Sequence, residues 1–414
     1  MADQPSTTSP SPSPHQARAL AIFQGASFAG AFDRFIVVPL IGLIATDLGR
    51  SIQQATLLAS SYFAAYAAMQ LVWGLVSDRV GRVRTIQVAL SVAGVAGLLS
   101  AVVPGFVPLL ATRVVVGAGF AAAMPNAIIY IGEVVAERHR QRPLAALMIG
   151  TALGTALASV VGALVADFVS WRLAFALTAA MALVLAALLL TVPATPPLVR
   201  TPLARSLRLV GRSPWARALL VIGLAEGAVL LGSLTFIPLT FERAGLDETL
   251  SGVLFGLYGA SVLGTSLLVR RWSGQLRDAH QMAIGAIASL CAFVVLRTDP
   301  AAVAIGIACL LLGFGWALLH TPMQAWATFV EPAARTVEVS LFATVLLLGG
   351  ALGTSIGSTV LGEDDFAGMY TYFAASMVAL GVLAVAFRAA FDRRRPLPIA
   401  VTSTPPSDER FSTP

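Results

Sequence analysis

Long apolar runs alternate with short polar breaks along almost the whole of this 414-residue chain. Each run has the roughly 20 residues that a helix needs to cross the hydrocarbon core of a bilayer. We expect each run to be one continuous helix, because lipid offers no partner for open backbone groups. The pattern predicts twelve spans, at residues 18–46, 53–76, 84–104, 106–131, 144–166, 171–192, 217–240, 250–270, 281–298, 301–329, 336–361 and 367–391.

The polar breaks divide these spans into two groups of six. The longest interior break lies between Pro193 and Trp215 and contains prolines and arginines but no acid. We therefore predict an all-α membrane protein with a six-helix half at 18–192, a cytoplasmic central loop at 193–216 and a second half at 217–391. Within that loop, residues 203–210 form either a short basic helix on anionic lipid or a plain linker. The polar ends, 1–17 and 392–414, are expected to be disordered cytoplasmic tails.

Composition agrees with a membrane protein. Hydrophobic residues make up 57% of the chain and charged residues 12%, an apolar share above that of a typical soluble domain. The sequence pI of about 10 would suit nucleic-acid binding, but the arginines lie in short loops between apolar runs, so no nucleic-acid partner is expected. Cys291 and Cys309 fall inside apolar runs and are expected to be small buried residues, not a disulfide or a metal site.

The arginines predict an orientation. All 27 basic residues are arginine, which, with the richness in Ala, Val, Leu and Gly, suggests a bacterial source with a GC-rich genome. If the N-terminus is cytoplasmic, the cytoplasmic segments carry 20 arginines, leaving out Arg410 in the far tail, and the outer segments carry 4. Short cytoplasmic loops collect Arg and Lys. We therefore predict a multi-pass protein of the bacterial inner membrane with both termini in the cytoplasm.

The densest cluster of charge is the hairpin from Gly74 to Thr85, between the second and third apolar runs. Its pattern Gly74-x-x-x-Asp78-Arg79-x-Gly81-Arg82-x-Arg84 is very similar to the best-known signature of the major facilitator superfamily. The string Arg113-Val114-Val115-Val116-Gly117-Ala118-Gly119 resembles the second motif of that superfamily. The resemblance implies the major facilitator fold, in which two six-helix halves give alternating access to a central cavity.

The resemblance also implies a cytoplasmic gate. In similar transporters the hairpin charges clamp the two halves on the cytoplasmic side, and Gly81 would serve the tight turn. Glu133, at the inner end of the fourth run, is a plausible partner for Arg82. The gate residues expected on this basis are Gly74, Asp78, Arg79, Gly81, Arg82 and Glu133.

Some residues resemble one branch of the superfamily, the twelve-helix drug/H⁺ antiporters. Tyr66, Gln70 and the pair Trp171-Arg172 carry this likeness. The fifth run departs from it, because these antiporters commonly have Gly-Pro-x-x-Gly-Gly where this chain reads Ala158-Ser159-Val160-Val161-Gly162-Ala163. The departure weakens the case for export without excluding it.

Three charged residues inside the predicted spans are candidates for proton coupling. Asp33 lies near the middle of the first run, where a carboxylate is costly unless it is paired or protonated. It is either a proton carrier or half of a structural ion pair with Arg34 or Arg113. Arg113 is expected, from the motif resemblance, to tune such an acid. Glu226 holds a proton, meets a cationic part of the substrate, or is a structural acid capped by a hydroxyl or water.

A second group of residues is expected to line the substrate cavity. His320 titrates near neutrality, although a lone histidine is more often a structural hydrogen-bonding group. The cavity residues predicted are Arg34, Tyr62, Tyr66, Gln70, Asn126, Phe236, Tyr258 and His320.

Together these features predict a proton-coupled secondary transporter, not an enzyme, that exports small lipophilic or cationic molecules. Its partners would be the substrate, protons and the bilayer, with no cofactor or metal, and a monomer is expected. Gly-x-Gly pairs such as Gly313-Phe314-Gly315 sit inside apolar runs, so a phosphate-binding loop lacks its strand-to-helix context. Two alternatives stay open: a proton-linked importer of organic acids or other metabolites, with Arg34 or Arg113 receiving a carboxylate, and a non-transporting membrane receptor.

Overall fold

The structure is a computed structural model that describes residues 14–135, 141–193, 203–272, 276–298, 300–361 and 365–394. Within these ranges every regular element is helical, and twelve helical segments are long and apolar enough to cross a membrane. The prediction of an all-α membrane protein with twelve spans is therefore confirmed. Most of the predicted tails, namely residues 1–13 and 395–414, lies outside the described residues.

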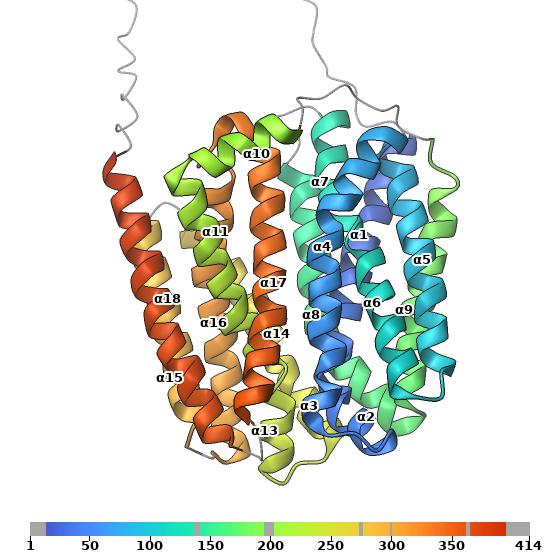
Figure 1. Cartoon of the computed structure of the whole chain (residues 1–414), viewed down its shortest axis with the longest axis vertical. Helices are drawn as coiled ribbons and strands as arrows, with labels where there is room; N and C mark the ends of the chain where they lie inside the picture. Colours follow the sequence, from blue (N-terminus) through green and yellow to red (C-terminus); the bar gives the residue numbers. More distant parts are fainter. Residues whose placement is uncertain are drawn as a thin grey trace, which may run out of the picture.

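The first half contains six of the twelve spans, and Figure 1 shows their helices as one group, coloured from blue to green. Its elements are α1 (Pro14–Ile36), η1 (Val38–Leu40), α2 (Ile41–Asp47), α3 (Ile52–Ala55), α4 (Leu57–Val80), α5 (Arg82–Val102), α6 (Phe106–Phe120), α7 (Ala123–Val134), α8 (Gln141–Phe168) and α9 (Trp171–Leu189).

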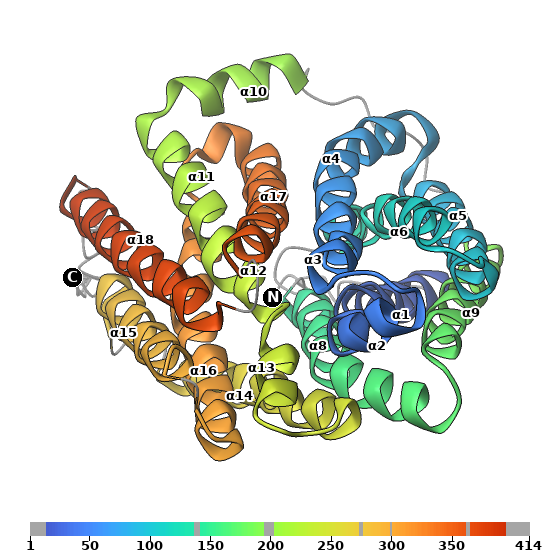
Figure 2. The same cartoon turned by 60° about the horizontal axis from the view of Figure 1, so that its bottom comes forward.

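The second half follows the linker helix α10 (Leu203–Arg212) and also contains six spans. Its elements are α11 (Pro214–Glu226), η3 (Gly227–Leu231), α12 (Gly232–Leu234), α13 (Ile237–Arg243), α14 (Glu248–Trp272), α15 (Asp278–Leu296), α16 (Ala302–Ala327), η4 (Pro332–Ala334), α17 (Arg335–Leu361) and α18 (Phe366–Arg394). Figure 2 shows the two halves as separate groups of helices.

The expectation of continuous helices is wrong for four spans. The first, second, fourth and seventh spans are each built from two or more helical pieces. Proline lacks a backbone N–H and is tolerated in the first turn of a helix, and Pro39, Pro125 and Pro238 all stand at or beside these breaks. The seventh span also contains a π-helical turn at Gly227–Leu231. The broken backbone is buried among neighbouring helices, where it is shielded from lipid.

The ends of the two halves differ from the predicted boundaries. Helix α1 already begins at Pro14, inside the predicted tail 1–17, and α18 continues to Arg394, beyond residue 391. In the central loop, the helical alternative is the one observed. In α10 the side chains of Ser206 and Val210 are buried, while its arginines are exposed. This helix is amphipathic and packs against α11, η4 and α17.

The two halves meet along α4 with α17 and along α8 with α14. Small residues allow the close approach: a Cβ on Gly259 would overlap Ala156, and a Cβ on Gly350 would meet Leu231 and approach Phe63. One hydrogen bond, 3.1 Å from the Thr344 hydroxyl to the Gln70 side chain, crosses the interface. Small residues that let helix backbones touch are the usual basis of helix packing in membranes.

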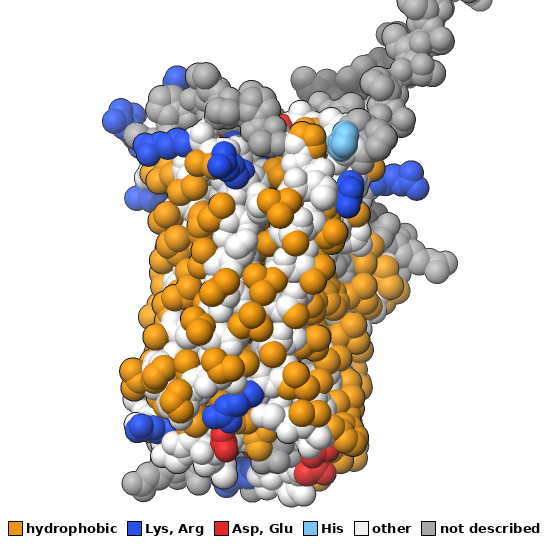
Figure 3. Space-filling view, turned by 90° about the vertical axis from the view of Figure 1, so that its right-hand side faces the viewer, with side chains coloured by type: hydrophobic (Ala, Val, Ile, Leu, Met, Phe, Trp, Pro, Cys, Tyr) orange, Lys and Arg blue, Asp and Glu red, His pale blue; other side chains and the backbone are white. Residues whose placement is uncertain are grey.

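The surface matches a protein embedded in lipid. A broad band of hydrophobic side chains separates two ends where charged side chains gather (Figure 3). Cys309 is buried as expected, but the expectation is wrong for Cys291, which is exposed. The reason is that apolar side chains on a membrane helix face lipid as readily as the protein interior, so an apolar run does not imply burial.

Candidate functional site

The most buried charged cluster joins three helices of the first half. The carboxylate of Asp33 on α1 accepts two hydrogen bonds of 3.1 Å from the guanidinium of Arg113 on α6. It also accepts a 2.7 Å hydrogen bond from the hydroxyl of Thr178 on α9. Asp33 and Arg113 are both fully buried. Two-pronged pairing of this kind is among the strongest hydrogen-bonded contacts that charged side chains make.

Aromatic rings complete the surroundings of Arg113. Its guanidinium carbon lies 4.9 Å from the ring centre of Tyr62 and 4.7 Å from that of Phe175. Cations over aromatic faces are stabilised by the ring quadrupole. Of the two arginines proposed as partners of Asp33, the structure therefore selects Arg113.

Arg34, the neighbour of Asp33 in the chain, has a different environment. Its guanidinium carbon lies 4.6 Å from the ring centre of Tyr66. Its Nε is buried without a hydrogen-bond partner, and among the described residues no carboxylate pairs with it. The hydroxyl of Tyr62 nearby is likewise buried without a partner. Four predicted site residues, Arg34, Tyr62, Tyr66 and Arg113, thus gather around Asp33.

The second half contains a pair of its own. Nδ1 of His320 on α16 lies 3.1 Å from Oε1 of Glu226 on α11, and the Glu226 side chain is fully buried. Among the described residues the partner of Oε1 is an imidazole and not a hydroxyl. The hydroxyl of Ser233 instead donates to the carbonyl oxygen of Leu230. His320 is correspondingly not a lone histidine.

Two aromatic rings flank the imidazole of His320. Its ring centre lies 4.6 Å from that of Trp316 and 5.8 Å from that of Phe342, and both pairs are stacked. Glu226 Oε2 is buried and has no hydrogen-bond partner among the residues that the structure describes. The carboxylate thus has one satisfied and one unsatisfied oxygen in the interior of the membrane domain.

The two pairs connect corresponding spans of the two halves. Asp33 and Arg113 connect the first and fourth spans of the first half. Glu226 and His320 connect the seventh and tenth spans, which are the first and fourth of the second half. Each half thus carries one acid on its first span and one basic side chain on its fourth, but at different heights along them: Asp33 precedes Pro39 by 6 residues, whereas Glu226 precedes Pro238 by 12.

The hairpin residues form a compact charge cluster. Gly81 connects α4 to α5 with φ +93°, as its predicted role in the turn requires. Arg82 is almost fully buried and pairs with Asp78 at 2.7 Å and Glu133 at 3.2 Å, and it also bonds the hydroxyl of Ser77. These contacts are internal to the first half. Arg79 is exposed, and a Cβ on Gly74 would meet nothing within 4 Å. A clamp across the halves stays a prediction.

The other predicted cavity residues are not brought together. Gln70 binds Thr344 across the interface of the halves. The amide nitrogen of Asn126 donates to the carbonyl oxygen of Ala122, one turn earlier. Phe236 packs against Phe373, and Tyr258 stacks on Phe255. These side chains are buried and make contacts that a purely structural role would also produce.

Sequence reasoning missed three buried residues, of which two contact the pairs and the third lies near the start of α17. Thr178 and Phe342 give no signal in a single sequence, because hydroxyl and aromatic residues are common in membrane helices. Glu338, in the first turn of α17, was visible as an acid at the start of an apolar run. Its side chain is fully buried, and neither carboxylate oxygen has a hydrogen-bond partner within the part of the chain that the structure describes.

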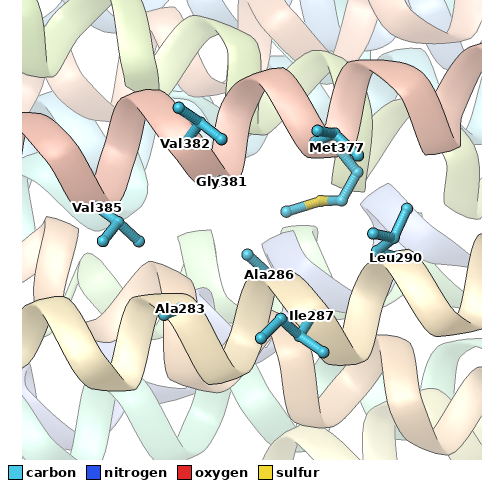
Figure 4. A pocket seen from close by; sticks show the side chains of 9 residues that line it. Ala283, Ala286, Ile287, Leu290, Met377, Gly381, Val382 and Val385 are labelled. Carbon is cyan, nitrogen blue, oxygen red and sulfur yellow. The ribbon is translucent and has the colours of Figure 1, made fainter.

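A shallow groove on the outside of the second half is separate from these clusters. It lies between α15 and α18 and has a volume of about 280 Å³ (Figure 4). Its lining is entirely apolar, from Ala283, Ala286, Ile287, Leu290, Met377, Val378, Gly381, Val382 and Val385. With no polar group to orient a ligand, it does not form a selective site.

Twelve spans in two halves, with buried acid–base pairs between helices, define a membrane transporter. The family model of the Major Facilitator Superfamily matches residues 23–354. The chain therefore belongs to the Major Facilitator Superfamily, as the hairpin motif predicted.

Some curated relatives share a shorter segment with this chain. It is 30% identical over 139 residues to a triacylglyceride transporter of Mycobacteroides abscessus, a match that covers 32% of this chain and 27% of the relative. It is also 30% identical over 135 residues to a triacylglyceride transporter of Mycolicibacterium smegmatis, covering 31% and 24%. The matched segment thus spans only about a quarter of each relative's length.

Solved structures resemble the whole fold. A bacterial homologue of the human lysosomal transporter Spinster, in an inward-facing and unoccupied conformation, has a TM-score of 0.72 at 18% identity and covers 92% of this chain and 98% of its own. A D-xylose–proton symporter has a TM-score of 0.72 at 16% identity, covering 90% and 97%. A peptide transporter has a TM-score of 0.75 at 14% identity, covering 91% and 95%. At these identities the likeness shows the fold alone.

Proposed function

We propose that this member of the superfamily is a proton-coupled secondary transporter that exports small lipophilic or cationic molecules across the bacterial inner membrane. It would work as a monomer by alternating access, with both termini in the cytoplasm. Asp33 would be the main proton site of the first half, and Arg113 would tune it.

The observation that carries the proposal is the fully buried Asp33–Arg113 pair. A charged pair in the membrane interior is costly and is a functional candidate by default. Protonation of Asp33 would weaken its two hydrogen bonds to Arg113 and free a cation inside the first half. Proton binding at this point would thus change the contacts that hold α1, α6 and α9 together.

The substrate class rests on two kinds of support. The buried aromatic side chains near both pairs favour an apolar substrate, and Glu226 offers a buried carboxylate to a cationic one. The relatives whose names describe triacylglyceride transport suggest lipophilic cargo. The fifth span lacks the proline of the Gly-Pro-x-x-Gly-Gly motif that is common in antiporters, and this difference argues against export.

Flux in proteoliposomes tests this proposal. Purified protein would be given a panel of lipophilic dyes, lipophilic cations and organic acids under an imposed pH gradient. In the wild type we expect lipophilic or cationic probes to move in the direction opposite to the protons. In Asp33→Asn we expect this coupling of probe movement to proton movement to be lost. Arg172→Gln, at an exposed pair with Asp47, is the matched control and should couple normally. Normal coupling in Asp33→Asn contradicts the proposal.

A second candidate is a proton-linked carrier of organic acids. The observation in its favour is Arg34, whose guanidinium lies on the ring of Tyr66 and has no carboxylate partner among the described residues. A substrate carboxylate would supply that partner. In the same panel, uptake of organic acids that is lost in Arg34→Gln and retained in Arg34→Lys would favour this candidate over export.

A further inference from the structure

We propose that Glu226 and His320 form a second proton-binding site, in the second half of the transporter, and that His320 is the group that takes up and releases the proton. The inference extends the proposed function: its role in transport rests on proton coupling, but proton binding by the pair does not.

The chemistry of the two pairs differs in their basic members. Arg113 keeps its proton at any physiological pH, so the first pair changes charge only when Asp33 is protonated. Imidazole changes charge between about pH 5 and 8. The pair of the second half therefore differs from the first in having a basic member that can change charge.

The accessibility of the two side chains indicates where the proton enters. The Glu226 side chain is fully buried, whereas 15% of the His320 side chain is exposed. With the Nδ1 hydrogen donated to Oε1 of Glu226, the incoming proton would add at Nε2 and leave from the same atom. Glu226 would stay in place as the counter-charge of the imidazolium.

Two aromatic rings and a carboxylate surround the imidazole of His320. The imidazole stacks between Trp316 and Phe342, and aromatic faces attract cations. Loss of its proton would leave the Glu226 carboxylate buried without a compensating charge, with Oε2 already unpartnered. A buried charge without a partner is strongly unfavourable, so deprotonation would drive the pair to a more hydrated arrangement.

The backbone at Glu226 is suited to such a change. The π-helical turn Gly227–Leu231 begins directly after Glu226. Single π-helical turns occur frequently at functional sites. Within this turn Gly227 lies so close to the backbone of Leu346 on α17 that a Cβ would overlap it. A shift of Glu226 would therefore be transmitted to α17, which contacts the other half through α4.

Other charged groups near the pair come from several helices. From α17, Glu338 lies one turn before Phe342 and hence on the same side of the helix, and Tyr258 on α14 interacts electrostatically with Glu226. The other charged residues of the packed elements lie in the outer turns of their helices. They are Arg388 paired with Asp278 and Asp392, Arg393 and Arg394 of α18, Arg217 of α11, Arg335 of α17, His280 of α15, Glu248, Arg270 and Arg271 of α14, the exposed Arg205, Arg208 and Arg212 of α10, and Glu242 and Arg243 of α13. Glu338 is thus the acid whose protonation must be separated from that of His320.

Tryptophan fluorescence tests the proposal without a substrate. Trp316 is in ring contact with His320, so a charge on the imidazole is expected to quench its emission. We expect purified wild-type protein to show a reversible fluorescence step between pH 5 and 9. His320→Asn keeps a donor near the position of Nδ1 but does not titrate, and it should lose the step. Glu226→Gln should move the midpoint at least one pH unit lower, because the imidazolium loses its counter-charge.

Matched variants make the assay selective. Trp316→Phe should remove the step while proton binding persists, which identifies the reporter. Glu338→Gln, Asp33→Asn and His280→Asn should retain the step; His280 is an exposed histidine on α15. Size-exclusion profiles verify that each variant is folded. An unchanged step in folded His320→Asn, or no step in the wild type, overturns the proposal. If the fluorescence change with pH behaves as expected but the protein shows no proton-linked flux, the proposed function is contradicted. The proposal that Glu226 and His320 bind a proton would still hold.

Discussion

The buried pair Asp33–Arg113 predicts a strong imbalance between removing one partner and removing both. Asp33→Leu leaves the fully buried guanidinium of Arg113 without its counter-charge, and Arg113→Met leaves the carboxylate of Asp33 without its two 3.1 Å hydrogen bonds from the guanidinium. Breaking a buried pair in this way costs about 3–5 kcal/mol, whereas replacing both members by apolar residues is often neutral. We therefore expect each single variant to lose about 3–5 kcal/mol and the double variant Asp33→Leu/Arg113→Met to lose about 1 kcal/mol or less.

Unfolding in mixed micelles of mild detergent and dodecyl sulfate measures these differences in the free energy of unfolding. The control is Arg172→Gln, whose partner Asp47 is 45% exposed at the side chain, so the loss should stay below about 1 kcal/mol. The informative quantity is the coupling between the two substitutions. Additive losses, with the double variant the least stable, would show that the pair is not a coupled buried unit and would refute the reasoning.

Three further predictions concern single positions. Glu338→Met should raise the free energy of unfolding by about 1–3 kcal/mol, because it removes a fully buried carboxyl group whose two oxygens have no partner among the described residues. A loss of stability in the same unfolding assay would show that the carboxyl group of Glu338 has a stabilising partner. Gly81→Ala should lower the free energy of unfolding by about 1–2 kcal/mol, because φ +93° is strained for a residue with a Cβ. Gly74→Ala is its control, because a Cβ at position 74 would lie in open space. Gly259→Leu should reduce transport at least tenfold in vesicles, because a side chain at position 259 would meet the backbone of Ala156 in the interface of the halves. Unchanged flux would mean that transport does not depend on this close approach of α8 and α14.

The sequence was most informative where the membrane itself constrains the chain. Length and hydropathy predict the spans because hydrocarbon excludes charged residues and open backbone, and the Gly81 hairpin motif identifies the family. The broken spans were not predictable in the same way. Proline at 39, 125 or 238 is compatible with either a kink or a helix start, and the packing of neighbouring helices decides between them.

The candidate site was predictable in its acids but not in their partners. Asp33 and Glu226 stand out because intramembrane acids are rare. Which base each acid meets depends on the rotation of helices that are far apart in the chain: Arg113 is 80 residues from Asp33, and His320 is 94 residues from Glu226. His320 has no partner near it in the sequence, but in the structure it pairs with Glu226. Thr178 could not be found from the sequence at all.

Internal pH recording in vesicles tests the central claim most directly, namely that substrate movement is tied to proton movement through Asp33. Vesicles that contain the purified transporter and a pH-sensitive dye would receive a lipophilic cation probe that the flux panel has identified as transported. The account predicts an immediate change of internal pH on addition of the probe to wild-type vesicles, and none with Asp33→Asn in folded protein that still binds the probe. Probe movement without a pH change in the wild type, or an undiminished pH change in Asp33→Asn, would contradict it.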